Sequence, residues 1–111
     1  MTVLEDLIIR KSALVFDSDS EARVSTEGLS SAELPGLLQA VVEQHAASVL
    51  EEGTAHAVSV TLDMSGDAKS GDDVEFRSRI DRKTRTLIFA SGVATQSDRH
   101  LLKATVVFRI S

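Results

Sequence analysis

One long helical pattern, followed by four strand-like segments, constrains the fold of this 111-residue chain more than any other feature. Residues 34–50, LPGLLQAVVEQHAASVL, repeat apolar side chains at helical spacing. Ser30 with Glu33 three residues later indicates a capping box, Pro35 suits the first turn, and Gly53 is expected to end the helix. The apolar residues share one face at about 100° per residue: Leu34, Leu37, Leu38, Val41, Val42, His45, Ala46 and Val49.

The second half of the chain is strand-like throughout. Apolar and polar residues alternate in residues 56–64, 73–81 and 101–110. Residues 86–95 are apolar or small on both faces, which predicts a central strand. Because the three connections between these segments are short and polar, we expect an antiparallel meander of four strands.

Two further strands are predicted before the helix, at residues 7–16 and 22–26, with a polar turn between them. Asp17 and Asp19 in this turn form a D-x-D pair that a cation could bind, but such carboxylates are more often plain turn residues. No His and acidic residues show metal-ligand spacing elsewhere. We therefore expect neither a metal nor a cofactor.

The predicted architecture contains more sheet than one helix can cover. A single helix of about 17 residues leaves apolar strand surface open to water, and a second copy of the chain is the simplest cover. We therefore expect a homodimer, with a dimer of dimers left open.

Composition excludes several classes of protein. The chain has no cysteine, and no apolar run reaches the roughly 20 residues of a membrane span. Together with the absence of a signal peptide, this suits the cytoplasm and gives no reason to expect a membrane partner. A net charge of −5 argues against general nucleic-acid binding.

The charge is nevertheless uneven along the chain. Residues 1–55 hold 10 acidic and 3 basic residues, whereas residues 56–111 hold 7 acidic and 9 basic ones. Five of the basic residues fall within residues 77–85. This cluster is either a solvated strand face with its turn or a local anion site on an otherwise acidic protein.

The helix and the strands after it resemble the hot-dog fold of the thioesterase superfamily over residues 34–111. The resemblance is strongest in VSVTLDMSGDAKSGDDVEFRSRIDRKTRTLIF, where a strand, a loop ending in Gly71 and Asp72, and the next strand have the family's spacing. LLKATVVFRI resembles the closing strand. The resemblance implies an α+β fold, with residues 1–111 forming one hot-dog domain whose antiparallel sheet wraps around one long central helix, as a homodimer.

The same resemblance implies an acyl-CoA thioesterase-like hydrolase. Related small acyl-CoA thioesterases carry a His-Gly-Gly turn into the helix and a catalytic Asp or Glu seven residues after the second Gly. Gly36 matches that Gly, and Glu43 lies seven residues on. Glu43 would act as base or nucleophile, with N–H groups near Gly36 and Leu37 as the oxyanion site. Ala40 and Ala47 complete a small-residue row that suits a seam with a ligand or a partner subunit, where burial would raise the carboxyl pKa.

Two other groups of residues are candidates for the site. Arg82, Lys83 and Arg85 lie in a strand connection where family members place bases that bind the phosphates of coenzyme A. His45 lies on the apolar helix face, where a packing role and a catalytic role are both open.

The chain also departs from the family pattern. Leu34 and Pro35 stand where the His and the first Gly would be, which favours an alternative: a non-catalytic hot-dog module that binds an acyl or aromatic ligand. The helix start also resembles hot-dog dehydratases, but these need a His before the helix and none precedes His45. The D-x4-H pattern of hot-dog hydratases is absent as well.

Overall fold

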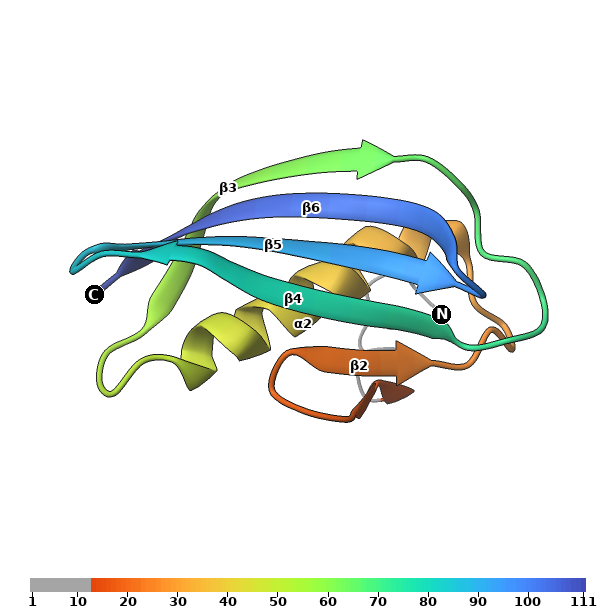
Figure 1. Ribbon diagram of the computed structural model, residues 1–111, viewed down its shortest axis with the longest axis horizontal. Helices are drawn as coiled ribbons and strands as arrows, with labels where there is room; N and C mark the ends of the chain where they lie inside the picture. Colours follow the sequence, from red (N-terminus) through yellow and green to blue (C-terminus); the bar gives the residue numbers. More distant parts are fainter. Residues whose placement is uncertain (1–12) are drawn as a thin grey trace, which may run out of the picture.

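A computed structural model describes residues 13–111, in which one helix lies against a curved six-stranded sheet (Figure 1). The elements in chain order are the strands β1 and β2, the helix α2, and the strands β3 to β6. Their bounds are β1 Val15–Phe16, β2 Glu21–Val24, α2 Leu34–Ser48, β3 Ala55–Met64, β4 Val74–Lys83, β5 Leu87–Gln96 and β6 Arg99–Ile110. Within the described residues, no helix is both long and apolar enough to cross a membrane.

The start of the helix is built as the sequence predicts. The Ser30 side chain accepts a hydrogen bond from the Ala32 N–H, and the Glu33 carboxylate accepts one from the Ser30 N–H at 2.9 Å, which confirms the capping box. A 3-10 turn at Ser31–Glu33 precedes α2. The apolar face is confirmed in its main part, since six of its residues are buried: Leu34, Leu37, Leu38, Val41, Val42 and Ala46.

The prediction that Gly53 ends the helix is wrong. α2 ends at Ser48, and Gly53 lies in the following loop with a φ of +87°. A Cβ at Gly53 would lie 2.8 Å from the carbonyl oxygen of Ser111. The lack of a side chain at Gly53 therefore lets this loop lie close to Ser111, just after β6. There Thr54 and Ser111 exchange two backbone hydrogen bonds.

The sheet order is β1-β2-β4-β5-β6-β3, and every neighbouring pair is antiparallel. β5 is central, as expected. The predicted four-strand meander is correct for β4, β5 and β6 but wrong for β3, which pairs with β6 at the far edge instead of with β4. Of the two strands predicted before the helix, β2 agrees closely. β1 is only Val15–Phe16, and residues 7–12 lie outside the described part of the chain.

The loop between β3 and β4 can cross the end of the sheet because Gln96 holds it there. The Gln96 side chain is buried; its Oε1 accepts from the Lys69 N–H at 2.8 Å, and its Nε2 donates to the carbonyls of Lys69 and Asp72. Ser97 Oγ donates to the Asp72 carboxylate next to this contact. Earlier in the loop, the N–H groups of Ser65 and Gly66 bond the Leu101 carbonyl. These contacts carry the chain past β6 and β5 before β4 begins.

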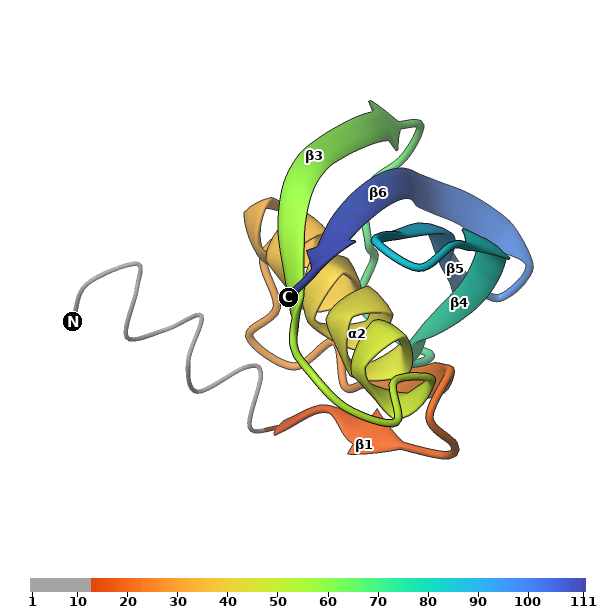
Figure 2. The same cartoon turned by 90° about the vertical axis from the view of Figure 1, so that its left-hand side faces the viewer.

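The concave face of the sheet wraps around α2 (Figure 2). The helix comes close to β5 at Gly92, where a Cβ would lie 2.7 Å from Val42 Cγ2 and 2.9 Å from Leu38 Cδ1. Glycine at this point lets the helix approach the middle of the sheet. The core contains this interface, with Phe76 and Phe108 as its largest buried side chains.

Candidate functional site

Glu43 lies on the side of α2 that faces away from the sheet. It is exposed, and its Oε1 accepts a hydrogen bond of 3.1 Å from Gln39 Nε2, one helical turn earlier. An open hollow of about 350 Å³ adjoins it, lined by Leu14, Phe16, Ala40, Glu43, Gln44 and Ala47. The carboxylate is therefore the one charged group in a shallow, partly apolar depression.

The small residues expected beside Glu43 are on its side of the helix. Ala40 and Ala47 line the hollow, and Leu14 and Phe16 face them from the segment before and within β1. Neither of these two residues was predicted from the sequence to belong to the site. Phe16 is 43% exposed, an unusual state for a phenylalanine in a small domain. The pattern of the sequence contained no signal for this contact, because it depends on how the N-terminal strand passes under α2.

Gly36 lies in the first turn of α2 and is half-buried. The helical part of the chain begins earlier, at the 3-10 turn Ser31–Glu33, and the side-chain cap is Ser30. Because α-helices rise about 1.5 Å per residue, Gly36 and Glu43 of one chain are separated by about 10 Å along the axis. The two sequence-predicted groups are thus on one helix but not within reach of a single carbonyl group.

His45 is on another side of the helix from Glu43. Residues two apart in a helix point about 200° from each other, and His45 is half-buried against β4, with its Nδ1 2.9 Å from Ser78 Oγ. The structure therefore does not bring His45 to the carboxylate. Its contact with Ser78 connects the helix to the sheet.

Arg82, Lys83 and Arg85 are exposed at the end of β4 and in the turn before β5. Figure 1 shows this hairpin at the end of the molecule where α2 terminates, opposite the end where α2 begins. Among residues 13–111, none of the three forms an ion pair. They are available to anions, but on one chain they are remote from Gly36.

Neither of the remaining histidines is brought to Glu43. His100 Nδ1 lies 2.9 Å from Ser65 Oγ at the surface, and His56 is exposed at the start of β3. In the described part of the chain, no three His, Asp or Glu side chains gather closely enough to hold a metal ion.

The edge strand β3 is uncovered on both faces. It has ten residues, and its apolar side chains are 40–60% exposed: Val58, Val60, Leu62 and Met64. Val60, Leu62 and Met64 pair in register with the buried Val106, Ala104 and Leu102 of β6 and lie on the same face of the sheet, whereas Val58 lies at a register shift between Ala57 and Ser59. The uncovered apolar surface predicted from the sequence is therefore present, and it is concentrated on this strand.

Comparison with known proteins rests on structure. No protein-family model matches the sequence, and no curated protein matches it. The phenylacetic acid degradation-related protein of Ralstonia eutropha JMP134 superposes with a TM-score of 0.76 at 17% identity, over 98% of this chain and 92% of that one. The chain has the hot-dog fold.

Two further solved structures extend this result. A hypothetical thioesterase protein of Streptococcus pneumoniae TIGR4, solved with coenzyme A, gives a TM-score of 0.73 at 15% identity, over 98% of this chain and 97% of that one. The tesB protein of Mycobacterium avium subs paratuberculosis gives a TM-score of 0.78 at 16% identity. The match covers 99% of this chain and 44% of that protein. Identities this low establish the fold and leave the activity to the site.

Proposed function

We propose that this hot-dog chain hydrolyses acyl thioesters of coenzyme A as a homodimer, with Glu43 as the general base or the nucleophile. The observation that carries the proposal is the position of Glu43 in an open hollow, among Leu14, Phe16, Ala40 and Ala47. An apolar wall beside one carboxylate suits an acyl chain whose carbonyl must meet a base. The solved hot-dog structures named as thioesterases, one of them containing coenzyme A, support the choice of substrate.

The hydrogen bond from Gln39 prepares Glu43 for this role. Gln39 Nε2 occupies Oε1 and fixes the plane of the carboxylate, while Oε2 has no hydrogen-bond partner among the described residues. As a base, Glu43 takes a proton from water as the water oxygen attacks the thioester carbonyl. The C–S bond then breaks, the thiolate is protonated, and the products are a carboxylic acid and coenzyme A. As a nucleophile, Glu43 would attack the thioester carbonyl and the C–S bond would break, so that the coenzyme A thiolate leaves and takes up a proton; water would then hydrolyse the resulting anhydride to the carboxylic acid and free Glu43.

A second copy is needed to complete this site. Donors to the developing oxyanion and the base must both lie about 3 Å from the reacting group, and about 10 Å of helix separates Gly36 from Glu43 in one chain. A homodimer would pair the Glu43 of one protomer with the helix start near Gly36 and Leu37 of its partner. The small side chains at Gly36, Ala40 and Ala47 would let the two helices come close.

The bare strand β3 is the proposed means of dimerisation. An unpaired ten-residue edge with four exposed apolar side chains is an aggregation hazard unless another strand covers it. Antiparallel pairing with the same strand of a second copy would continue the sheet across a two-fold axis. Arg82, Lys83 and Arg85 would then bind coenzyme A phosphates at the rim, through exposed and salt-sensitive contacts.

The test is thiol release from a panel of short, long and aromatic acyl-CoA esters. Glu43→Gln keeps the size and the Gln39 contact of the side chain but removes the base, so turnover should fall by about 10²–10⁴. Glu51→Gln, just beyond the helix, removes the same charge and should leave turnover unchanged. Unaltered turnover in the Glu43→Gln protein would exclude Glu43 from the mechanism.

One observation favours a second candidate, a non-catalytic hot-dog module that binds an acyl or aromatic ligand. Leu34 and Pro35 take the place of the His and the first Gly that the thioesterase resemblance requires. Saturable binding of acyl-CoA esters without thiol release, across the whole panel, would establish this alternative.

A further inference from the structure

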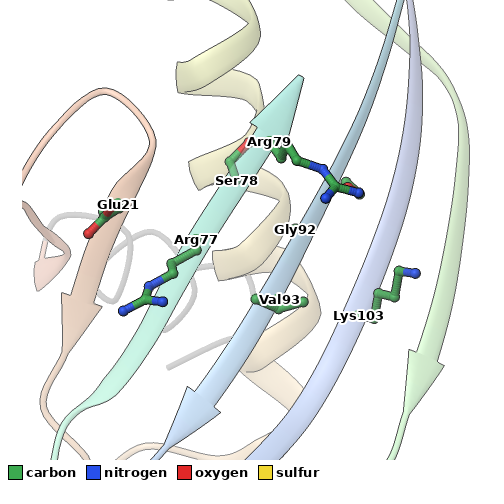
Figure 3. A pocket seen from close by; sticks show the side chains of 8 residues that line it. Glu21, Arg77, Ser78, Arg79, Gly92, Val93 and Lys103 are labelled. Atoms are coloured by element: carbon green, nitrogen blue, oxygen red, sulfur yellow. The ribbon is translucent and has the colours of Figure 1, made fainter. Parts of the chain in front are cut away.

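We propose that the face of the sheet turned away from α2 contains a second binding site, for a compact molecule that carries a phosphate or diphosphate group. The site is an open groove of about 450 Å³ over the middle of the sheet (Figure 3), and Arg77, Arg79 and Lys103 are its cations. It does not depend on the proposed hydrolase activity.

The register of the sheet brings these residues together. Glu21 of β2 pairs with Arg77 of β4, Arg77 with Val93 of β5, Val93 with Lys103 of β6, and Lys103 with Asp63 of β3. Directly paired residues in a sheet point to the same face. One row across five strands therefore reads acid, base, apolar, base, acid. Arg77 and Lys103, 26 positions apart in the sequence, flank Val93 at two strand spacings, about 10 Å.

Two of the three cations form no close ion pair in the described part of the chain, although the charge of Lys103 also acts on Asp81. Neither Arg77 nor Lys103 forms an ion pair within residues 13–111. Arg79 donates from Nε to Asp81 Oδ1 at 2.7 Å, which leaves its terminal nitrogens free of that contact. Figure 3 shows the Arg79 side chain reaching across β5 and the Arg77 side chain turned toward β2. Among the residues that line the groove, these three cations outnumber the one carboxylate, Glu21.

The floor of the groove is small and uncharged. Ser91, Gly92 and Val93 of β5 line it between the two flanking strands. Val93 provides an apolar surface, the Ser91 hydroxyl interacts with Asp81, and the lack of bulk leaves room for a ligand among the longer side chains. Because three cations surround this floor and Asp81 offsets part of their charge, a group with two negative charges matches the groove better than a single carboxylate.

This groove is separate from the site at Glu43. The helix packs on the opposite face of the sheet, and Glu43 projects from the far side of that helix. A ligand in the groove would have the sheet and α2 between itself and the carboxylate. The hairpin bases Lys83 and Arg85 are not among the groove residues either.

A second copy of the chain is a weaker candidate for the occupant. If two such faces stack about a two-fold axis along the strands with Val93 over Val93, the row places Arg77 over Lys103 and Glu21 over Asp63. Like charges then meet at four points, which opposes the contact. A small dianion is instead attracted by both flanking bases.

The test is titration calorimetry of the full chain with sodium pyrophosphate and with ADP at low salt. The double variant Arg77→Gln with Lys103→Gln should bind on the order of tenfold more weakly. The matched control is Lys69→Gln with Arg109→Gln, which removes the same two charges from exposed residues outside the groove and should bind as the parent protein does. Circular dichroism establishes that both variants are folded.

Three results would overturn the proposal. One is an absence of heat with both probes at millimolar concentration. Another is equal weakening in the two double variants, which would mean attraction to net charge alone. The third is that the Arg77 and Lys103 changes split a larger oligomer in light scattering without altering pyrophosphate binding, so that the face joins copies. Thiol release from acyl-CoA esters should be unaffected by the Arg77 and Lys103 changes, because the groove is separate from Glu43.

Discussion

β5 and β3 are both ten-residue strands, yet they occupy opposite situations in the sheet. β5 lies between β4 and β6, and every second residue is buried against α2. β3 pairs on one side only, and its apolar residues are largely exposed. Alternation of residue types therefore predicts a strand but not its surroundings. Position in the sheet decides whether an apolar residue becomes part of the core or a surface for a partner.

The largest effect is expected at the middle of β5. Gly92→Val would push methyl groups into the space already occupied by Val42 and Leu38. Since the helix and sheet must move apart, the free energy of unfolding should fall by about 3 kcal/mol or more, as measured by urea denaturation. Thr61→Val, a change to the same residue on the exposed strand β3, should alter it by less than about 0.5 kcal/mol. A similar loss of unfolding free energy at Gly92 and at Thr61 would refute the claim that β5 packs tightly while β3 lies exposed.

On β3, we expect a substitution to change the free energy of unfolding less than Gly92→Val does, but to weaken the proposed dimer strongly. Leu62→Asp places a charge on the exposed apolar side of the strand, which the core of its own chain does not need. We expect the circular dichroism spectrum to persist while light scattering shows the proposed dimer shifting to monomer, because a partner strand would have to bury that charge. Thr105→Asp, on the outward side of the interior strand β6, is the control and should leave the dimer intact. A dimer unchanged by Leu62→Asp would place the interface elsewhere.

The smallest effect is expected at Asp81 of β4, which lies next to Ser91 of β5. Partial burial raises the pKa of Asp81, but hydrogen bonds from Ser91 and Arg79 and the charges of Arg79 and Lys103 outweigh it, so the pKa lies below its ordinary value of 3.8. A lowered pKa stabilises the fold above pH 3.8, and this contribution is lost as the pH falls through the folded-state pKa. Asp81→Asn should therefore reduce stability at pH 7 by less than about 0.5 kcal/mol, with the difference vanishing in acid. A difference that persists or grows at low pH would contradict this role.

The parts of the fold that follow from neighbouring residues were predictable. The capping box at Ser30 and Glu33, the buried helix face and the central place of β5 all depend on local spacing and on the length of apolar runs. The partner of β3 was not predictable, because a nine-residue polar loop can turn back or cross the end of a sheet. The buried amide of Gln96 selects the crossing, and a lone glutamine before a turn gives no signal of that role.

In the candidate site too, local spacing predicted some features, while others depend on the folded structure. Helical spacing placed Ala40, Glu43 and Ala47 on one side, and the structure has them around one hollow. Spacing could not show that Phe16 faces them, or that His45 would turn to Ser78. Arg77 and Arg79 were singled out as part of a basic cluster, but Lys103 was not. Its place beside them depends on the register of two hairpins, which only the folded sheet fixes.

The position of β6 has a consequence for how the protein is made. The last strand of the chain lies between β5 and β3, so residues 55–64 find their neighbour only when residues 102–110 are available. During synthesis, Val58, Val60, Leu62 and Met64 therefore remain in an unpaired segment until β6 has left the ribosome. This strand order makes closure of the sheet a late step of folding, and a chain without β6 would leave the helix with only part of its cover.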